Sequence, residues 1–274
     1  MLGKLLKNDF IGSAHAMLPV YLVALIAGAV TALSYVFNIN FLKYIGSLTL
    51  VLLVFGLVII TLFLMMSYFN KSLYSDQGYL SYTLPVKSRD LLFSKVAVSF
   101  VWLTISYLVL AAFVVGALWY AKVKLDESLG GEIDELINAI GSLVSSNGLP
   151  SVAAIAKIVA IVLVYGFVSI LILVSQVFFS MTLSNVRGFN KLGFFGGILI
   201  FAALFIIMKI ASSLIMVYFP ISLFISGDGI KITMKSMADV GSTYGIGGFL
   251  FEAIVSVGLL FATNSLMSKK INLR

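Results

Sequence analysis

The chain has 274 residues, of which 61% are hydrophobic and only 11% are charged, and its formal net charge is +7. An ordinary soluble domain carries roughly 25% charged residues, so this chain has too few to cover a surface in water. It has no cysteine, which excludes disulfides, thiolate metal sites and a thiol nucleophile. Its basic residues are spread between apolar runs instead of sharing one wettable face, which argues against nucleic acid as a partner. The composition therefore predicts a protein that lies in lipid.

Residues 1–16 are predicted to form a short amphipathic helix in the headgroup layer. Such a helix could be an elbow that contacts a partner subunit, or it could simply anchor the chain to the membrane surface. The apolar stretch that follows is longer than the core of a signal peptide, so we expect it to be the first span. At helical spacing, Leu2, Leu5, Leu6 and Phe10 fall on one side of the helix, and Lys4, Lys7 and Asn8 fall on another.

Six apolar stretches are long enough to cross the bilayer as helices, for which about 20 residues suffice. Four follow from long gaps between charged residues, and two more each contain a single internal charge. The stretches are continuously apolar, whereas the strands of a membrane barrel alternate in polarity. We therefore predict an all-α integral membrane protein with one transmembrane domain over residues 1–274. The predicted spans cover residues 17–37, 44–69, 91–119, 152–183, 192–219 and 244–267.

The positive-inside rule gives the orientation of these spans. With both termini in the cytoplasm, 11 of the 18 Lys and Arg residues lie inside, six lie outside, and Lys209 lies within a span. The inner set is Lys4, Lys7, Lys71, Lys87, Arg89, Lys95, Arg187, Lys191, Lys269, Lys270 and Arg274. The outer set is Lys43, Lys122, Lys124, Lys157, Lys231 and Lys235.

Residues 71–90 form the predicted cytoplasmic loop between the second and third spans, and they mix tyrosines and leucines with a few charges. Pro85 breaks any helix before it, Ser88 is placed to cap the next helix, and Asp90 falls in that helix's positive first turn. Aromatic side chains on a small exposed element are typical of a protein contact site. The alternative is that these tyrosines only belong to the aromatic belt at the lipid interface.

The sequence YSDQGYLSYTLPV over residues 74–86, together with the six spans and the amphipathic start, resembles the ABC-2 type permeases of bacterial ABC exporters. The specific resemblance covers residues 71–95 only. It implies a type V exporter-like transmembrane domain with an N-terminal elbow helix, and a coupling helix that docks on a separate ATPase subunit. Many relatives have two acidic residues before the glycine, where this chain has Asp76 and Gln77. The residues implied in ATPase coupling are Asp76, Gln77, Gly78, Tyr79, Leu80, Tyr82 and Leu84.

The resemblance further implies the transmembrane subunit of an ATP-driven exporter in the bacterial cytoplasmic membrane, paired with a second permease copy and surrounded by membrane lipid. The expected cargo is an amphipathic or antimicrobial-type peptide; a lipid, a drug or an ion is the alternative. A secondary transporter or a scaffold without an ATPase partner also stays open. The chain has no G-x-x-x-x-G-K-[ST] motif and a single histidine, His15. It is therefore not expected to be an enzyme by itself or to hold a metal or cofactor, and ATP and Mg²⁺ would belong to the partner.

Lys209 and Glu252 are the two charges inside the last two predicted spans, at similar depth in the outer half of the membrane. A lone charge at mid-membrane costs about 2.5–3.5 kcal/mol, so we expect the two to pair or to meet water. They could line a translocation path. Alternatively, they form a structural pair, or Lys209 reaches outward to the interface while Glu252 lies near it.

Two longer segments are predicted outside the membrane. In residues 120–151, an acidic cluster precedes apolar residues at helical spacing, which suggests a short amphipathic helix. That helix could meet a cationic cargo or only cap the outer surface. Residues 220–243 are long enough for a broken or partly re-entrant element before the sixth span.

Overall fold

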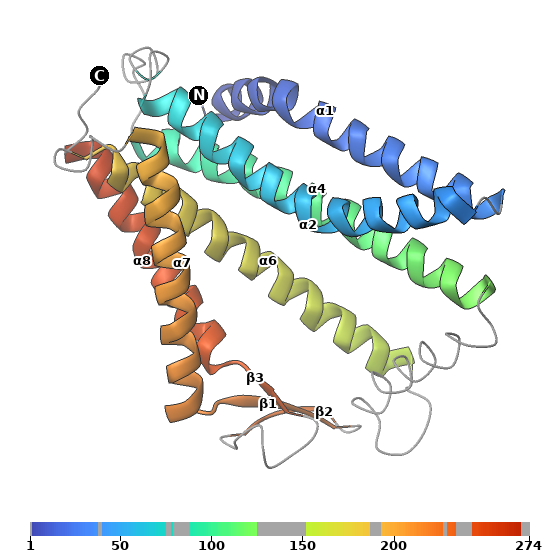
Figure 1. Cartoon of the computed structure of the whole chain (residues 1–274). Helices are drawn as coiled ribbons and strands as arrows, with labels where there is room; N and C mark the ends of the chain where they lie inside the picture. The colour runs from blue at the N-terminus through green and yellow to red at the C-terminus, as the bar shows by residue number, and fades with distance from the viewer. Residues whose placement is uncertain are drawn as a thin grey trace. The chain divides into compact units, whose positions relative to one another are not determined.

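The computed structural model describes residues 2–37, 40–74, 78, 88–124, 152–186, 193–226, 229–233 and 243–269 (Figure 1). Six helices in this part of the chain are long and apolar enough to cross a membrane, and each falls on one of the predicted spans. The helices are α1 (Leu2–Val36), α2 (Asn40–Tyr74), α4 (Ser88–Lys124), α6 (Val152–Ser184), α7 (Gly193–Tyr218) and α8 (Gly247–Lys269). The chain is thus built as a multi-pass helical membrane protein.

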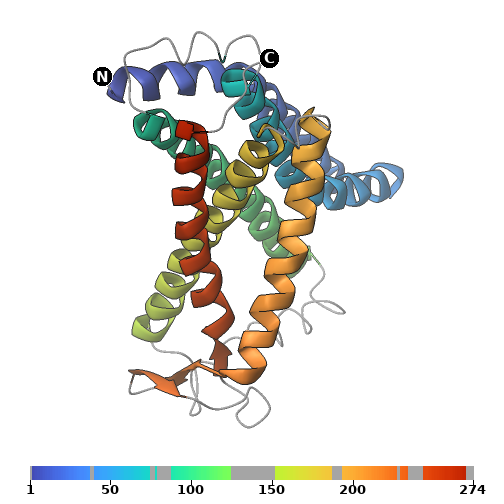
Figure 2. The ribbon, with the colours of Figure 1, turned by 90° about the vertical axis from the view of Figure 1, so that its left-hand side faces the viewer.

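The first helix begins ahead of the predicted first span, because α1 runs without interruption from Leu2 through that span. Pro19 lies inside α1, where it removes one backbone donor and its ring clashes with the carbonyl four residues earlier. Such a proline bends a helix without ending it. Figures 1 and 2 show that α1 changes direction along its length. Residues 2–16 are therefore helical and continue into the first span as one bent helix, and an elbow helix in the headgroup layer stays a prediction.

The chain divides into two compact units. One comprises Met1–Ala117, Val177–Ile198 and Ala262–Arg274, and the other comprises Leu118–Gln176 and Leu199–Phe261. Helices α6, α7 and α8 each contribute to both.

In the first unit, α1 shows which side chains face inward. Met17, Tyr21 and Ala24 recur at helical spacing and are buried, whereas Leu18 and Leu22 are each 58% exposed. Exposed leucines at this density would promote aggregation in water, but they are the expected surface in lipid. The interior also holds many buried hydroxyl groups, which let membrane helices approach closely and hydrogen-bond. Those of α1, α2 and α4 are Ser13, Thr31, Thr61, Ser72, Ser94, Ser99 and Ser106.

Four helix ends lie together in the first unit. Asp9 near the start of α1 bonds to Lys95 near the start of α4, and Tyr74 at the end of α2 bonds to Thr182 near the end of α6. The N-terminal segment and the 71–90 loop therefore emerge at the same end of this unit, as alternating spans require.

The second unit contains a small antiparallel sheet where residues 220–243 were expected to form a broken or re-entrant element. Its strands β1 (Ser222–Ser226), β2 (Gly229–Thr233) and β3 (Thr243–Gly245) take the order β2-β1-β3. The sequences SLFIS and GIKIT are rich in residues that favour strands, and Gly227-Asp228 between them is typical of a two-residue hairpin turn. Figures 1 and 2 show the sheet where α7 ends and α8 begins.

The other outer segment lies mostly beyond the described residues. Helix α4 continues to Lys124 and α6 begins at Val152, so the amphipathic helix expected within residues 120–151 stays a prediction.

Helices α7 and α8 approach closely at Gly248. A Cβ added there would lie 2.6 Å from the backbone oxygen of Ser212, whereas a Cβ at Gly258, further along α8, would meet nothing within 4 Å. We expect Gly248→Ala to lower the free energy of unfolding by about 1–3 kcal/mol, the usual range for overpacking. Gly258→Ala is the matched control and should leave stability unchanged or raise it, since alanine favours helix. Thermal unfolding in detergent measures both, and equal effects would contradict the close approach.

The orientation can be tested directly because the chain has no cysteine of its own. We expect an impermeant maleimide to label a Ser226→Cys variant in intact cells, since β1 is placed outside by the positive-inside count. An Asn8→Cys variant should be labelled only after the cells are permeabilised. The reverse pattern would show that the orientation is inverted.

Candidate functional site

The loop predicted to couple to an ATPase leaves α2 at Tyr74 and enters α4 at Ser88. Helix α4 begins at the serine predicted to cap it, with Asp90 in its first turn. Gly78 is the one described residue between these helices, and it is buried. A Cβ on Gly78 would lie 2.4 Å from the backbone oxygen of Leu73, so the chain passes too close to α2 there for any side chain. The other predicted coupling residues, Asp76, Gln77, Tyr79, Leu80, Tyr82 and Leu84, lie outside the described residues.

A buried ion pair stands at the base of this loop. Lys95 on α4 donates through its ammonium to Asp9 Oδ1 on α1, and their side chains are 6% and 7% exposed. Ser94 donates to Asp9 Oδ2, and Tyr68 on α2 donates to the backbone oxygen of Asp9 at 3.2 Å. We call Asp9, Tyr68, Ser94 and Lys95 the Asp9 cluster. It joins the first three long helices where the loop begins and ends.

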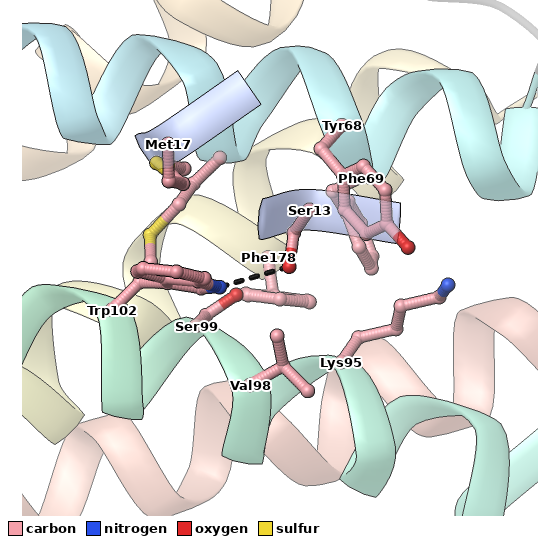
Figure 3. A pocket seen from close by; sticks show the side chains of 10 residues that line it. Ser13, Met17, Tyr68, Phe69, Lys95, Val98, Ser99, Trp102 and Phe178 are labelled. Carbon is pink, nitrogen blue, oxygen red and sulfur yellow. Dashed lines mark hydrogen bonds between the residues drawn. The ribbon is translucent and has the colours of Figure 1, made fainter. Parts of the chain in front are cut away.

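The next layer of the first unit is centred on Trp102 of α4. Its indole donates to the hydroxyl of Ser13 at 2.8 Å, and its ring stacks on Phe10 with centroids 4.9 Å apart. Tyr21 donates to the backbone oxygen of Trp102 at 2.9 Å. Figure 3 shows the small cavity between this layer and Lys95, whose volume is only about 10 Å³. Such a space holds at most one water molecule, so this region is a packed joint and not a ligand pocket.

The far side of the loop base is attached to α6. The hydroxyls of Tyr74 and Thr182 lie 2.8 Å apart, and Asn185 donates to the side-chain oxygen of Asn70 at 3.2 Å. Beneath them, the rings of Phe69 and Phe178 are in edge contact with centroids 4.0 Å apart. Buried side-chain contacts therefore join the last turns of α2 to α6, just as they join the first turns of α4 to α1.

Of the predicted elbow residues, Phe10 packs on Trp102 in this joint. Leu2, Leu5 and Leu6 are half-buried, and Phe10 is 38% exposed while it covers one face of Trp102. The inward-facing residue of this turn is Asp9, which the prediction of an amphipathic helix did not identify. Asp9, Ser13 and Met17 follow one another every fourth residue, and that spacing is the signal that could have marked the buried face.

The structure brings Lys209 and Glu252 together in the second unit. Lys209 Nζ lies 2.8 Å from Glu252 Oε1 and 2.9 Å from Oε2. The Glu252 side chain is 6% exposed, whereas that of Lys209 is 53% exposed. The ammonium also lies 5.6 Å from the ring centroid of Phe205, one turn earlier on α7. It is thus held against its own helix and Glu252, and does not extend toward the end of α7.

This pair borders an open cleft of about 250 Å³. Among the described residues, no group of three or more His, Cys, Asp or Glu side chains could hold a metal ion. The residues that line the cleft are Tyr165, Lys209, Ser212, Ser213, Met216, Gly248, Phe249 and Glu252.

No protein-family model, curated protein or solved structure matches this chain. The fold therefore defines a class, a multi-pass α-helical membrane protein, and the resemblance to ABC-2 permeases rests on the sequence of the loop and the number of spans.

The Asp9 cluster is expected to contribute to the free energy of unfolding. Asp9→Asn leaves the Lys95 ammonium buried without its counter-ion, so we expect it to cost about 3–5 kcal/mol of unfolding free energy. The double variant Asp9→Asn/Lys95→Met removes both charges and should recover much of that loss. Arg89→Gln, which changes an exposed charge close to Lys95, is the control and should have little effect. Additive losses in the double variant, measured by unfolding in detergent, would show that the pair contributes no coupling.

Proposed function

We propose that this chain is the transmembrane subunit of an ATP-driven exporter of the ABC-2 type, acting with a separate ATPase subunit and a second permease copy. The observation that carries the proposal is that the helices on both sides of the 71–90 loop are fixed to neighbouring helices. The loop bears the family-like sequence, and both of its ends start from helices fixed to α1 and α6 by buried polar contacts. A force on the loop would reach four helices at once.

The physical basis for this transmission is the rigidity of the joint. Hydrogen bonds and a buried ion pair in a packed interior have few alternative arrangements, so helices joined by them move together. Gly78 adds to this, because its backbone lies against the last turn of α2 with no room for a side chain. A docking segment in residues 75–87 would then act on the membrane helices through a short connection.

An amphipathic or antimicrobial-type peptide is the proposed cargo, on the strength of the resemblance alone. A second candidate function is secondary transport, which the paired Lys209 and Glu252 in an open cleft favour, because ion-coupled transporters use such intramembrane groups. Dependence on ATP separates the two.

The test is co-purification of the full chain in detergent with the ATPase encoded nearest to it, followed by measurement of ATPase activity. We expect a stable complex, and we expect Tyr79→Ala and Leu80→Ala each to weaken it by about 1–2 kcal/mol, roughly 5–30-fold in affinity. Gly78→Ala should lower the activity too, since its Cβ would displace the loop from α2.

Tyr107→Ala is the matched control, because Tyr107 is an exposed tyrosine on α4 outside the loop. It should leave both the complex and its activity unchanged. Failure to form a complex with any ATPase, while transport persists in proteoliposomes without ATP, would overturn the exporter proposal in favour of secondary transport.

A further inference from the structure

The cleft beside Lys209 combines features that the exporter proposal does not use. It lies entirely in the second unit and has a volume of about 250 Å³. That is room for a headgroup-sized ligand, in contrast to the cavity of about 10 Å³ beside Lys95. The two ion pairs therefore differ in kind, since one is sealed and the other is open on the side of its cation.

The polar groups that the cleft offers are hydrogen-bond donors. An ammonium carries three N–H donors, and the two oxygens of Glu252 do not surround it, because the Lys209 side chain stays 53% exposed. Tyr165, Ser212 and Ser213 line the same cleft, and the Ser213 hydroxyl donates to the backbone oxygen of Ile210 at 2.8 Å. Its one carboxylate is turned inward, with the Glu252 side chain only 6% exposed. A ligand that enters thus meets the Lys209 cation beside side chains that carry hydroxyls, an arrangement that suits an oxyanion.

The cleft extends from Lys209, in the middle part of α7, toward one end of the second unit. On α7 its lining runs from Lys209 to Met216, two residues before the helix ends, and on α8 it begins at Gly248, one residue after the helix starts. The lining therefore extends toward the end of the second unit that carries the sheet. By the positive-inside count this end is the outer one, where lipid phosphates lie.

The remaining walls suit a ligand with an apolar body. Tyr165 and Phe249 stack with centroids 4.3 Å apart, and Met216 adds a flexible apolar side chain. A soluble anion would make no use of these walls, whereas the glycerol and upper acyl chain of a lipid would pack on them.

We propose that this cleft binds the phosphodiester of an outer-leaflet phospholipid. Lys209 donates to a phosphate oxygen with the lining hydroxyls beside it, and Glu252 holds the ammonium in place and moderates its charge. The proposal does not depend on the exporter function, because it concerns the permease chain alone.

The test is native mass spectrometry of the full chain released from detergent, with phosphatidylglycerol as the probe. We expect the wild type to retain phosphatidylglycerol, and Lys209→Met to lose at least about tenfold in affinity, the value of one hydrogen bond to a charged group. Glu252→Gln keeps the cation and removes its resident counter-charge, so it should bind the anionic lipid several-fold more tightly. A purely structural ion pair predicts no such gain.

Two further variants distinguish a loss of lipid binding from a loss of folding. Lys209→Met/Glu252→Gln removes both charges, so it avoids an unpaired buried carboxylate and should fold while it still fails to retain the lipid. Ser256→Ala changes a buried hydroxyl of α8 that does not line the cleft, and it should bind as the wild type does. Unchanged lipid retention in both Lys209 variants would overturn the proposal. So would displacement of the lipid by millimolar inorganic phosphate, since that would show a site for soluble oxyanions.

Discussion

Hydrocarbon neither hydrates a charge nor completes a hydrogen bond, and the arrangement of this protein depends on that constraint. Among the described residues, each of the buried charged side chains, Asp9, Lys95 and Glu252, is paired with a charged residue on another helix. Asp9 meets Lys95 across 86 positions of sequence, and Glu252 meets Lys209 across 43. The buried hydroxyls are hydrogen-bonded as well: that of Ser13 donates to the backbone one turn earlier on its own helix, whereas those of Tyr21 and Thr61 contact the hydroxyl of Ser106 on a neighbouring helix. Polar contacts of this kind decide which helix faces touch, since apolar side chains gain little by leaving lipid for one another.

The two ion pairs differ in how far they are shielded from their surroundings. In the first unit both charges are sealed and surrounded by aromatic and hydroxyl side chains, so the pair acts as a rigid joint. In the second unit the Glu252 side chain is buried and the Lys209 side chain is half exposed beside a cleft. A sealed pair can hold helices in register, whereas a half-open pair can also recognise a ligand. The first pair therefore fits a role in transmitting movement between helices, and the second fits a role in binding a ligand.

Much of the fold could be predicted from the sequence. The six spans follow from the lengths of the apolar stretches, and the start of α4 follows from Ser88 and Asp90, whose effects on a helix end are local. The continuity of α1 through its bend and the strands before α8 did not follow from the sequence. Pro19 marks a bend but does not fix whether the helix continues, and a segment such as SLFIS favours a strand only when a partner strand is present to complete its hydrogen bonds.

The sequence by itself determined that this protein lies in a membrane, how many times it crosses, and that Lys209 and Glu252 need partners, because these depend on composition, length and the cost of a charge in lipid. Only the tertiary structure decided that Asp9 and Lys95 form a buried pair. From the sequence both belonged to the cytoplasmic edge, where charges are common and need no partner. Which of two faces of a helix turns inward depends on the neighbouring helices, and so do the depth of Glu252, the exposure of Lys209 and the cleft between them.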